Sequence, residues 1–384
     1  VDAVVDGFTI TRGYYASDGG GVRILSGGGT IQNCIISNNV AGTGGGGMQL
    51  SSTGTIRVIG CTITHNQAGT GGGIRIRDDG GDYAVLNCTI VTNTSSGMAG
   101  IWDAAAGGSL FSNCIIRSNV SLGNIGGGSG GRYVDCHIVG NHAATLAGGL
   151  SNPALVQRCV IASNTAATTY GGGMSLSGSG YATNCQIFAN SAGTHGGGVY
   201  FSSGGALYDS QVFSNTAASN GGGAYGNVGG KLQNCLLFGN SAGGGGGGAL
   251  LDRIGQNGGA MVSCTVSDNT AAGSGGGLFL DAKAVITVTN TIIAGNATDG
   301  GDSPNLYAYG ANTKAFWHCC CPDYASFEPG QGNLQTDPLF VDAANADYRL
   351  QRASPCIDAG TNLSWMAGAT DLAGNARIDS PDDL

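Results

Sequence analysis

Charged residues are scarce in this sequence of 384 residues. Asp, Glu, Lys and Arg make up 10% of it, with 15 basic residues against 24 acidic ones and a formal charge of -9. So few basic residues argue against binding to nucleic acid or to an acidic membrane surface. No run of 18 apolar residues is present, so no membrane-spanning helix is predicted. The first residues, VDAVVDGFTI, lack the basic and apolar regions of a signal peptide. We therefore expect a soluble chain that is either a mature product or a fragment.

Glycine, in contrast, is abundant. The chain has 74 Gly and is 41% hydrophobic, which makes it too apolar for a disordered protein and too rich in glycine for a mainly helical domain. The length alone would suggest two or three domains, but a solenoid has no single core that limits its growth. The internal repeats therefore decide the architecture.

The chain repeats itself at intervals of 22 to 29 residues. One position of the repeat, called here the Cys position, is occupied by cysteine in nine repeats and by Ser210 and Thr291 in two more. The cysteines are Cys34, Cys61, Cys88, Cys114, Cys136, Cys159, Cys185, Cys235 and Cys264. Five residues after the Cys position, every repeat has an asparagine, and we call this set the Asn ladder. Its members are Asn39, Asn66, Asn93, Asn119, Asn141, Asn164, Asn190, Asn215, Asn240, Asn269 and Asn296.

The spacing of apolar residues predicts short strands in each repeat. Two residues after the Cys position stands an aliphatic residue such as Ile36, and this period of two predicts a strand with both side chains pointing inward. A second strand is predicted where a glycine run precedes an apolar pair, as in Gly71 to Gly73 before Ile74 and Ile76. A coil of about 26 residues cannot bury these side chains alone and must stack on its neighbours. The sequence therefore predicts an all-β fold, a right-handed parallel β-helix of about twelve coils over residues 1–298.

The composition changes after Asn296. Most of the prolines, two of the three tryptophans and the last four cysteines follow residue 300. We expect residues 299–384 to form an irregular C-terminal cap, because a solenoid needs its open end covered. The start shows no comparable cap, since Phe8 and Ile10 of the segment GFTITRG already belong to the first coil. Either residues 1–7 fold across this edge, for which they are a short segment, or the C-terminal region of another subunit docks there in a head-to-tail contact, which would build a filament when repeated.

Several segments carry a resemblance to a known family. VVDGFTITRG, the coils of GGG-apolar and NCxIxxN type, and the tail DPLFVDAANADYRLQRASPCIDAGTN with TDLAGNARI resemble bacterial surface and secreted right-handed β-helix proteins with a choice-of-anchor C-terminal region. The coils also loosely resemble the repeats of polymorphic outer-membrane proteins. The resemblance covers essentially the whole chain and implies an extracellular or cell-surface location, but no activity. Relatives usually begin with a further coil and cap and continue to a sorting signal, so it also implies that both ends have been removed.

The repeated residues have structural interpretations. Asn tolerates the left-handed conformation of a tight corner, and stacked amides can hydrogen-bond from coil to coil. The Cys residues are expected to be small buried side chains, with occasional disulfides between coils allowed but not required. The glycine runs do not predict a phosphate site, because no helix follows any of them. Two interpretations of these runs stay open: backbone freedom at a corner, or a surface without side chains onto which another chain packs.

The segment Trp317-His318-Cys319-Cys320-Cys321 suggests either a metal site or a disulfide. No paired metal-ligand spacing supports the metal, and consecutive side chains of an extended chain point to alternate sides. We favour a disulfide between Cys356 and one of Cys319, Cys320 and Cys321, which oxidising conditions outside the cell would allow. No cofactor is predicted, and no motif supports a Ca²⁺ site.

The sequence favours an extracellular structural protein over an enzyme. We predict a β-helical rod that serves as an adhesin, matrix component or filament subunit, with self-association and surface glycans as its partners. The alternative is a protein that binds or degrades polysaccharides, for which the loop from Arg75 and Arg77 to Asp78, Asp79 and Asp82 is the best candidate. Aligned aromatic and acidic side chains over three or more coils would favour this alternative, whereas the sequence aligns only Asn, Cys, Ile and Gly.

Overall fold

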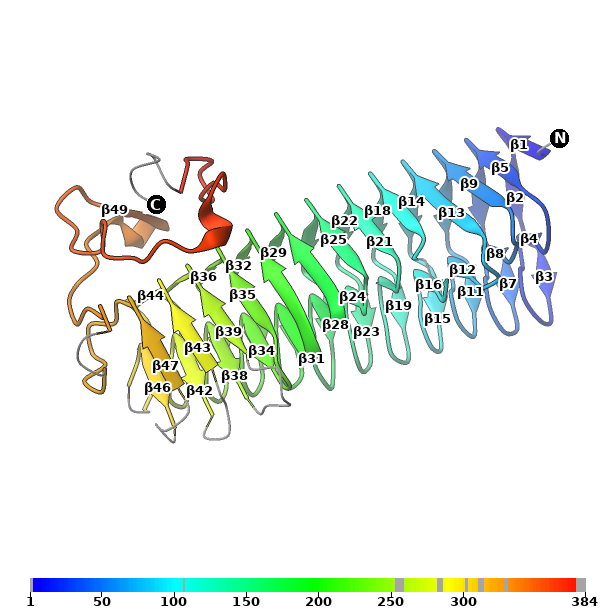
Figure 1. Ribbon diagram of the computed structural model, residues 1–384. Helices are drawn as coiled ribbons and strands as arrows, with labels where there is room; N and C mark the ends of the chain where they lie inside the picture. Colours follow the sequence, from blue (N-terminus) through cyan, green and yellow to red (C-terminus); the bar gives the residue numbers. More distant parts are fainter. Residues whose placement is uncertain are drawn as a thin grey trace. The chain divides into compact units, whose positions relative to one another are not determined.

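The computed structural model describes residues 3–105, 108–252, 259–281, 286–300, 303–309, 314–327 and 331–377 (Figure 1). The chain divides into two compact units, Val1–Val199 and Tyr200–Leu384. Helical structure among the described residues is limited to two short 3-10 turns, η2 (Ala343–Asn345) and η3 (Ser364–Met366). Nearly all the regular structure is therefore strand, and the predicted all-β class is confirmed.

In the first unit, the strands that follow the Cys position stack in parallel and in register. Ile63 pairs with Ile36 on one side and with Ile90 on the other, so equivalent residues of successive coils are neighbours. These strands are β2 (Thr9–Thr11), β6 (Ile35–Ser37), β10 (Thr62–Thr64), β14 (Thr89–Val91), β18 (Ile115–Arg117), β22 (His137–Val139), β26 (Val160–Ala162) and β29 (Gln186–Phe188). The segment GFTITRG supplies β2, as the sequence predicts.

Two-residue strands follow the Asn ladder and stack in the same way. They are β3 (Tyr14–Tyr15), β7 (Val40–Ala41), β11 (Gln67–Ala68), β15 (Thr94–Ser95), β19 (Val120–Ser121), β23 (His142–Ala143), β27 (Thr165–Ala166) and β30 (Ser191–Ala192). Each of these two-residue strands forms only one short side of its coil.

The remaining strands of the first unit lie after the glycine runs and before the Cys position. The strands after the glycine runs are β4 (Val22–Ile24), β8 (Met48–Leu50), β12 (Ile74–Ile76), β16 (Ile101–Asp103), β20 (Gly128–Ser129) and β24 (Leu150–Ser151). The strands before the Cys position are β1 (Ala3–Asp6), β5 (Gly29–Gln32), β9 (Thr55–Ile59), β13 (Asp82–Leu86), β17 (Leu110–Ser112), β21 (Arg132–Val134) and β25 (Leu155–Gln157), and β28 (Met174–Thr183) combines both kinds.

The second unit repeats this arrangement and extends it past residue 298, the expected end of the coils. Strands β46 (Leu306–Ala308) and β47 (Lys314–Trp317) pair in parallel with β42 and β43, so the coils continue into the region expected to be a cap. The other strands are β31 (Val199–Tyr208), β32 (Gln211–Phe213), β33 (Thr216–Ala217), β34 (Ala224–Gly226), β35 (Lys231–Gln233), β36 (Leu236–Phe238), β37 (Ser241–Ala242), β38 (Ala249–Leu251), β39 (Ala260–Val262), β40 (Thr265–Ser267), β41 (Thr270–Ala271), β42 (Leu278–Leu280), β43 (Ile286–Thr289), β44 (Ile292–Ala294) and β45 (Ala297–Thr298).

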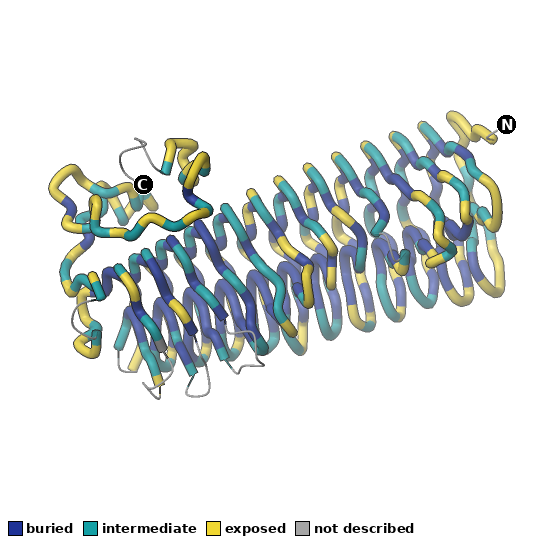
Figure 2. The backbone as a smooth tube through the Cα atoms, in the orientation of Figure 1, coloured by how far each residue is buried: buried dark blue, intermediate teal, exposed yellow. Residues whose placement is uncertain are grey.

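The region after the coils is irregular. It contains one antiparallel pair, β48 (Phe340–Asp342) with β49 (Asp347–Leu350), and otherwise turns and extended segments. Figure 2 shows this region mostly exposed or half-buried, whereas buried backbone follows the coils within each unit. Inward side chains such as Ile36, Ile63 and Phe111 are fully buried. The core is therefore a stack of identical or similar residues, as expected for coils in register.

The corners differ from the sequence prediction in one respect. The Asn-ladder residues do not adopt the left-handed conformation among the described residues; the residue before each of them does, as at Asn38 (φ 55) and His65 (φ 54). A second left-handed position lies directly before the Cys position, as at Asn33 (φ 51) and Asn87 (φ 55). The prediction that the ladder Asn provides the left-handed corner is thus wrong by one residue. The ladder position is reserved for hydrogen bonding.

Candidate functional site

The Asn ladder connects successive coils by side-chain amides. The Oδ1 atom of Asn66 accepts hydrogen bonds from the backbone N–H and from Nδ2 of Asn39, each at 3.0 Å. The Nδ2 atom of Asn66 donates to the carbonyl oxygen of Ile36 at 2.9 Å and to Oδ1 of Asn93 at 3.0 Å. All donors and acceptors of the buried amide are therefore used, and the ladder has no group left for a ligand.

Two residues extend the ladder beyond the repeats found in the sequence. The backbone N–H and Nδ2 of Asn296 donate to Oδ1 of Asn305, at 2.9 and 3.0 Å. The Nδ2 of Asn305 in turn donates to Oδ1 of Asp323 at 3.0 Å. The sequence analysis missed both because neither follows a Cys position by five residues. The apolar Leu306 directly after Asn305 was the available signal of a further coil.

The cysteine thiols form a second ladder inside the coils. The backbone N–H of Cys61 donates to Sγ of Cys88 at 3.3 Å, and the thiol of Cys61 donates to the carbonyl oxygen of Ile59 at 3.4 Å. All thirteen cysteines of the chain are free thiols in the structure. Burial raises the pKa of Cys185 to about 12. Cys185 therefore stays protonated and behaves as a small apolar side chain.

The glycine runs are buried at the corners next to the Asn ladder. A Cβ atom on Gly47 would lie 2.7 Å from the carbonyl oxygen of Gly73 and 3.0 Å from Nδ2 of Asn66. Gly45, two residues earlier, has a φ of +66°. The close approach of the next coil and of the ladder amide therefore excludes a side chain. Because these glycines are buried within the unit, they offer no open surface to another chain, and the corner interpretation is the one that fits.

In the first unit, the loop proposed for carbohydrate chemistry is held by contacts between coils. Arg75 pairs with Asp18 at 2.5 Å, with side chains 12% and 11% exposed, and its guanidinium carbon lies 4.4 Å from the centre of the Trp102 ring. Gln49, in register with Arg75, is 1% exposed, and its amide has no hydrogen-bond partner among the described residues. Sequence reasoning missed Asp18, Gln49 and Trp102 because they lie on different coils.

Burial and the nearby charges of Asp79, Asp103 and Asp78 raise the pKa of Tyr83, but the carboxylates of Asp79 and Asp82 have different partners. Asp79 accepts a hydrogen bond from the hydroxyl of Ser51, and Asp82 pairs with Arg57 at 2.6 Å. Arg77 lies 4.0 Å from Asp18. The loop therefore uses its carboxylates in separate contacts with neighbouring coils.

Asp103 is the carboxylate of the first unit with the clearest electrostatic perturbation. It ends β16, pairs in register with the core residue Ile76 and is buried. Its carboxylate accepts hydrogen bonds from the backbone N–H groups of Ala105 at 3.0 Å and Ser109 at 2.9 Å. Burial raises the pKa of Asp103 above 3.8 despite these hydrogen bonds. Since Asp103 faces the interior, its role is in the packing of the coil.

In the second unit, the C-terminal region attaches to the coils through residues that directly precede the Cys position. Thr361 donates its backbone N–H to Oδ1 of Asn290 at 2.9 Å, and Nδ2 of Asn290 donates to the carbonyl oxygen of Thr361 at 2.7 Å. The Nδ2 atom of Asn234 donates to the carbonyl oxygen of Thr370 at 3.1 Å. The left-handed corner turns these amides outward, where they bind the backbone of the returning chain.

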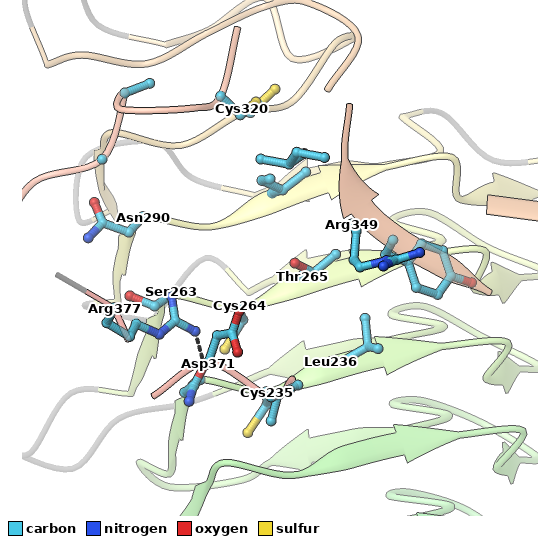
Figure 3. A pocket seen from close by; sticks show the side chains of 18 of the residues that line it. Cys235, Leu236, Ser263, Cys264, Thr265, Asn290, Cys320, Arg349, Asp371 and Arg377 are labelled. Carbon is cyan, nitrogen blue, oxygen red and sulfur yellow. Dashed lines mark hydrogen bonds between the residues drawn. The ribbon is translucent and has the colours of Figure 1, made fainter. Parts of the chain in front are cut away.

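A cavity of about 790 Å³ lies between this returning chain and the outer faces of β36, β40 and β44 (Figure 3). Ser263 lines it, is 8% exposed and has no hydrogen-bond partner for Oγ among the described residues. Arg377 also lines it; Nη2 donates to Oδ1 of Asn234, while Nε has no partner among the described residues. Burial lowers the pKa of Arg377. The cavity is of a size that holds a small ligand.

The four candidate cysteines of the cap occupy different environments. Cys319 continues the Cys ladder, since its thiol donates to the carbonyl oxygen of Val288 at 3.3 Å. Cys321 donates to Oδ1 of Asp323 at 3.3 Å. Cys320 and Cys356 both line the cavity, where the proximity of the two thiols raises the pKa of Cys320 and lowers that of Cys356, and the thiol of Cys320 donates to the carbonyl oxygen of Thr336 at 3.2 Å. The structure thus brings together one of the three predicted pairs.

Three observations concern the predicted assembly edge, metal sites and membrane-spanning helices. Phe8 is 60% exposed, and Ile10 is half-buried. Among the described residues, no group of three or more His, Cys, Asp or Glu side chains is placed to hold a metal ion. The part of the chain that the structure describes also holds no helix long and apolar enough to cross a membrane.

Comparison with known proteins identifies the fold. The model of the family described as "Right handed beta helix region" matches residues 2–99 and 70–212. No curated protein matches the chain. Among solved structures, the crystal structure of the TibC-catalyzed hyper-glycosylated TibA55-350 fragment is similar at 15% sequence identity, covering 82% of this chain and 100% of that chain with a TM-score of 0.26.

Proposed function

Because this chain belongs to the right-handed β-helix family, we propose that it is an extracellular structural protein, a β-helical scaffold of a bacterial adhesin, matrix or filament. The observation that supports this is the difference between the inward and the outward residues of the coil. The ladder amides are saturated by one another, whereas the outward position of β10, β14, β18 and β22 changes from Thr62 and Thr89 to Ile115 and His137. A constant interior with a variable exterior suits a scaffold that presents its surface.

Protease protection on intact producing cells tests the location. Antibodies against the chain are expected to label the cell surface or the surrounding matrix, and external proteinase is expected to remove the label. A cytoplasmic protein serves as the control and must survive the same treatment. Labelling of this chain only after lysis would contradict the proposal.

The proposal includes no enzymatic activity, and incubation with a panel of neutral and acidic polysaccharides tests this part. We expect no new reducing ends and no unsaturated products over those formed by the heat-inactivated protein. Sustained product formation that is lost in the Arg75→Ala variant would overturn the structural role and favour a polysaccharide-degrading enzyme.

Head-to-tail self-association stays a prediction within this proposal. Negative-stain microscopy of native material and scattering over a concentration series are expected to show polymers, and Phe8→Glu is expected to shorten them because it charges the predicted contact. Isolated particles of 37.9 kDa at every concentration would leave a solitary surface protein.

The cavity of the second unit favours carbohydrate binding as a second candidate function. Its lining combines amides, hydroxyls and a half-buried guanidinium, groups that form hydrogen bonds with sugar hydroxyls and carboxylates. Ser263 Oγ and Arg377 Nε lack partners among the described residues. A glycan array followed by calorimetry tests this role. Ser263→Ala and Arg377→Ala are expected to lower the affinity at least about tenfold, while the exposed control Arg117→Ala leaves it unchanged. Equal affinity of all variants would reject the cavity as the site.

A further inference from the structure

The three consecutive cysteines of the last coil face different sides because side chains alternate along an extended chain. Cys319 and Cys321 are held by Val288 and Asp323, as described above. Cys320 forms parallel bridges with Ile292 on one side and Leu334 on the other. Ile292 belongs to the outer face of β44 that lines the cavity, so Cys320 faces the returning chain; Cys319 also lines the cavity, but its thiol donates to Val288 of the coil.

Cys356 meets Cys320 from the returning chain. Both cysteines line the cavity, where Figure 3 shows Cys320, and the thiol of Cys320 donates to the carbonyl oxygen of Thr336 at 3.2 Å. The backbone N–H of Cys356 donates to Oγ of Ser354 at 3.2 Å, and Ser354 is itself buried with its hydroxyl on the carbonyl oxygen of Pro338 at 2.5 Å. Cys356 is half-buried, so a small reagent can reach it through the cavity.

The environments of the two thiols differ in a way that suits stepwise chemistry. Cys356 is half-buried, whereas Cys320 is only 3% exposed. A disulfide from solution therefore reaches Cys356 first, so Cys356 is the attacking residue and Cys320 the one that resolves. Neighbouring ladder thiols such as Cys235 and Cys264 also shift each other's pKa, but they are buried inside the coils, where a disulfide from solution does not reach them.

We propose that Cys320 and Cys356 are a redox-active pair, which closes to a disulfide by exchange with a low-molecular-weight disulfide such as oxidised glutathione. The Cys356 thiolate attacks one sulfur of that disulfide, forms a mixed disulfide and releases one thiolate. Cys320 then gives up its proton and attacks the Cys356 sulfur, releasing the second thiolate. Two protein thiols are oxidised and one small disulfide is reduced to two thiols. The product ties the segment around Ser354 covalently to the last coil, independently of the proposed function.

Oxidation of the full chain with oxidised glutathione tests this proposal. The number of thiols titrated in denaturant is expected to fall from thirteen to eleven. Tryptic digestion without reductant should join residues 315–349 to residues 353–377, and fragmentation of this pair should place the link on Cys320. Thirteen thiols after oxidation, or a link through Cys319 or Cys321, would overturn the proposal.

Matched serine variants provide a second, independent readout. Cys320→Ser and Cys356→Ser are expected to abolish the link, whereas Cys321→Ser retains it. In the parent, oxidation should slow proteolysis after Arg349 and Arg352 at least about fivefold by constraining the returning chain, and Cys356→Ser should show no such change. If Cys320→Ser does not fold, the fragmentation of the parent peptide still decides the position. Retention of the link in Cys356→Ser would refute the pair.

Discussion

Replacing one amide of the Asn ladder should destabilise the first unit through groups on the neighbouring coil. Oδ1 of Asn141 accepts from the backbone N–H of Asn119 at 3.1 Å and from its Nδ2 at 2.9 Å. Nδ2 of Asn141 donates to the carbonyl oxygen of Ile116 and to Oδ1 of Asn164, at 2.9 and 3.0 Å. Asn141→Leu keeps the number of side-chain heavy atoms and the branch at Cγ but removes all four hydrogen bonds.

The expected loss follows from the buried groups that stay behind. Two N–H groups of Asn119 lose their acceptor, at a cost of about 1 to 3 kcal/mol each. Burial of the leucine side chain offsets this by about 1.5 to 3 kcal/mol. A Cβ on Gly127 would lie 3.2 Å from Nδ2 of Asn141, so little space exists for rearrangement. The middle of each range leaves a net loss of about 2 kcal/mol in the free energy of unfolding.

Urea unfolding followed by circular dichroism measures this loss, and hydrogen exchange at the amide of Asn119 localises it. The matched control is Gln186→Leu, which replaces an exposed amide on the outward side of β29 and should change stability by less than about 0.5 kcal/mol. The reasoning is refuted if Asn141→Leu and this control have the same free energy of unfolding and the Asn119 amide exchanges as slowly as in the parent. In that case the ladder does not stabilise the coils.

Three further predictions concern the corners, the interior and the returning chain. Gly127→Ala should destabilise the first unit, because its Cβ would lie 2.4 Å from the carbonyl oxygen of Gly149, while Gly300→Ala, with nothing within 4 Å, should be neutral in thermal melts. Since burial raises the pKa of Asp103, the folded chain holds this proton more tightly than the unfolded chain; its stabilising effect is complete below pH 3.8 and is lost as the pH rises through the raised pKa. Asp103→Asn should lack this part of the pH dependence in urea titrations, and identical profiles would contradict it. Tyr348→Ala should speed trypsin cleavage after Arg349, because the hydroxyl donates to Asp268 at 2.7 Å and the ring packs on Phe238, whereas Tyr348→Phe should have a smaller effect; equal rates would show that this contact does not hold the segment.

The class of fold and the repeating unit could be predicted from the sequence. The period of two around Ile36, the asparagine five residues after the Cys position and the glycine runs each report a local requirement that every coil must meet. Because coils stack in register, such a requirement recurs at the same place in every repeat, and repetition makes it visible in the sequence. Asn305 and Asp323 could not be predicted in this way, because they belong to the ladder but do not follow the regular spacing.

The contacts between side chains of different coils that do not follow the repeat could not be predicted from the sequence. Asp18 reaches Arg75, 57 residues away, and Cys356 meets Cys320 rather than Cys319 or Cys321. Neither contact can be derived from the repeat. The contact of Asp18 with Arg75 depends on which coils are neighbours, and the contact of Cys356 with Cys320 depends on the path of the segment after the coils. The left-handed residue also lies one position before the ladder Asn, because the amide of that Asn must point inward to its neighbours while the residue before it turns the corner. The periodicity of the sequence therefore predicts the stacking of the coils, whereas the candidate sites depend on contacts that do not repeat.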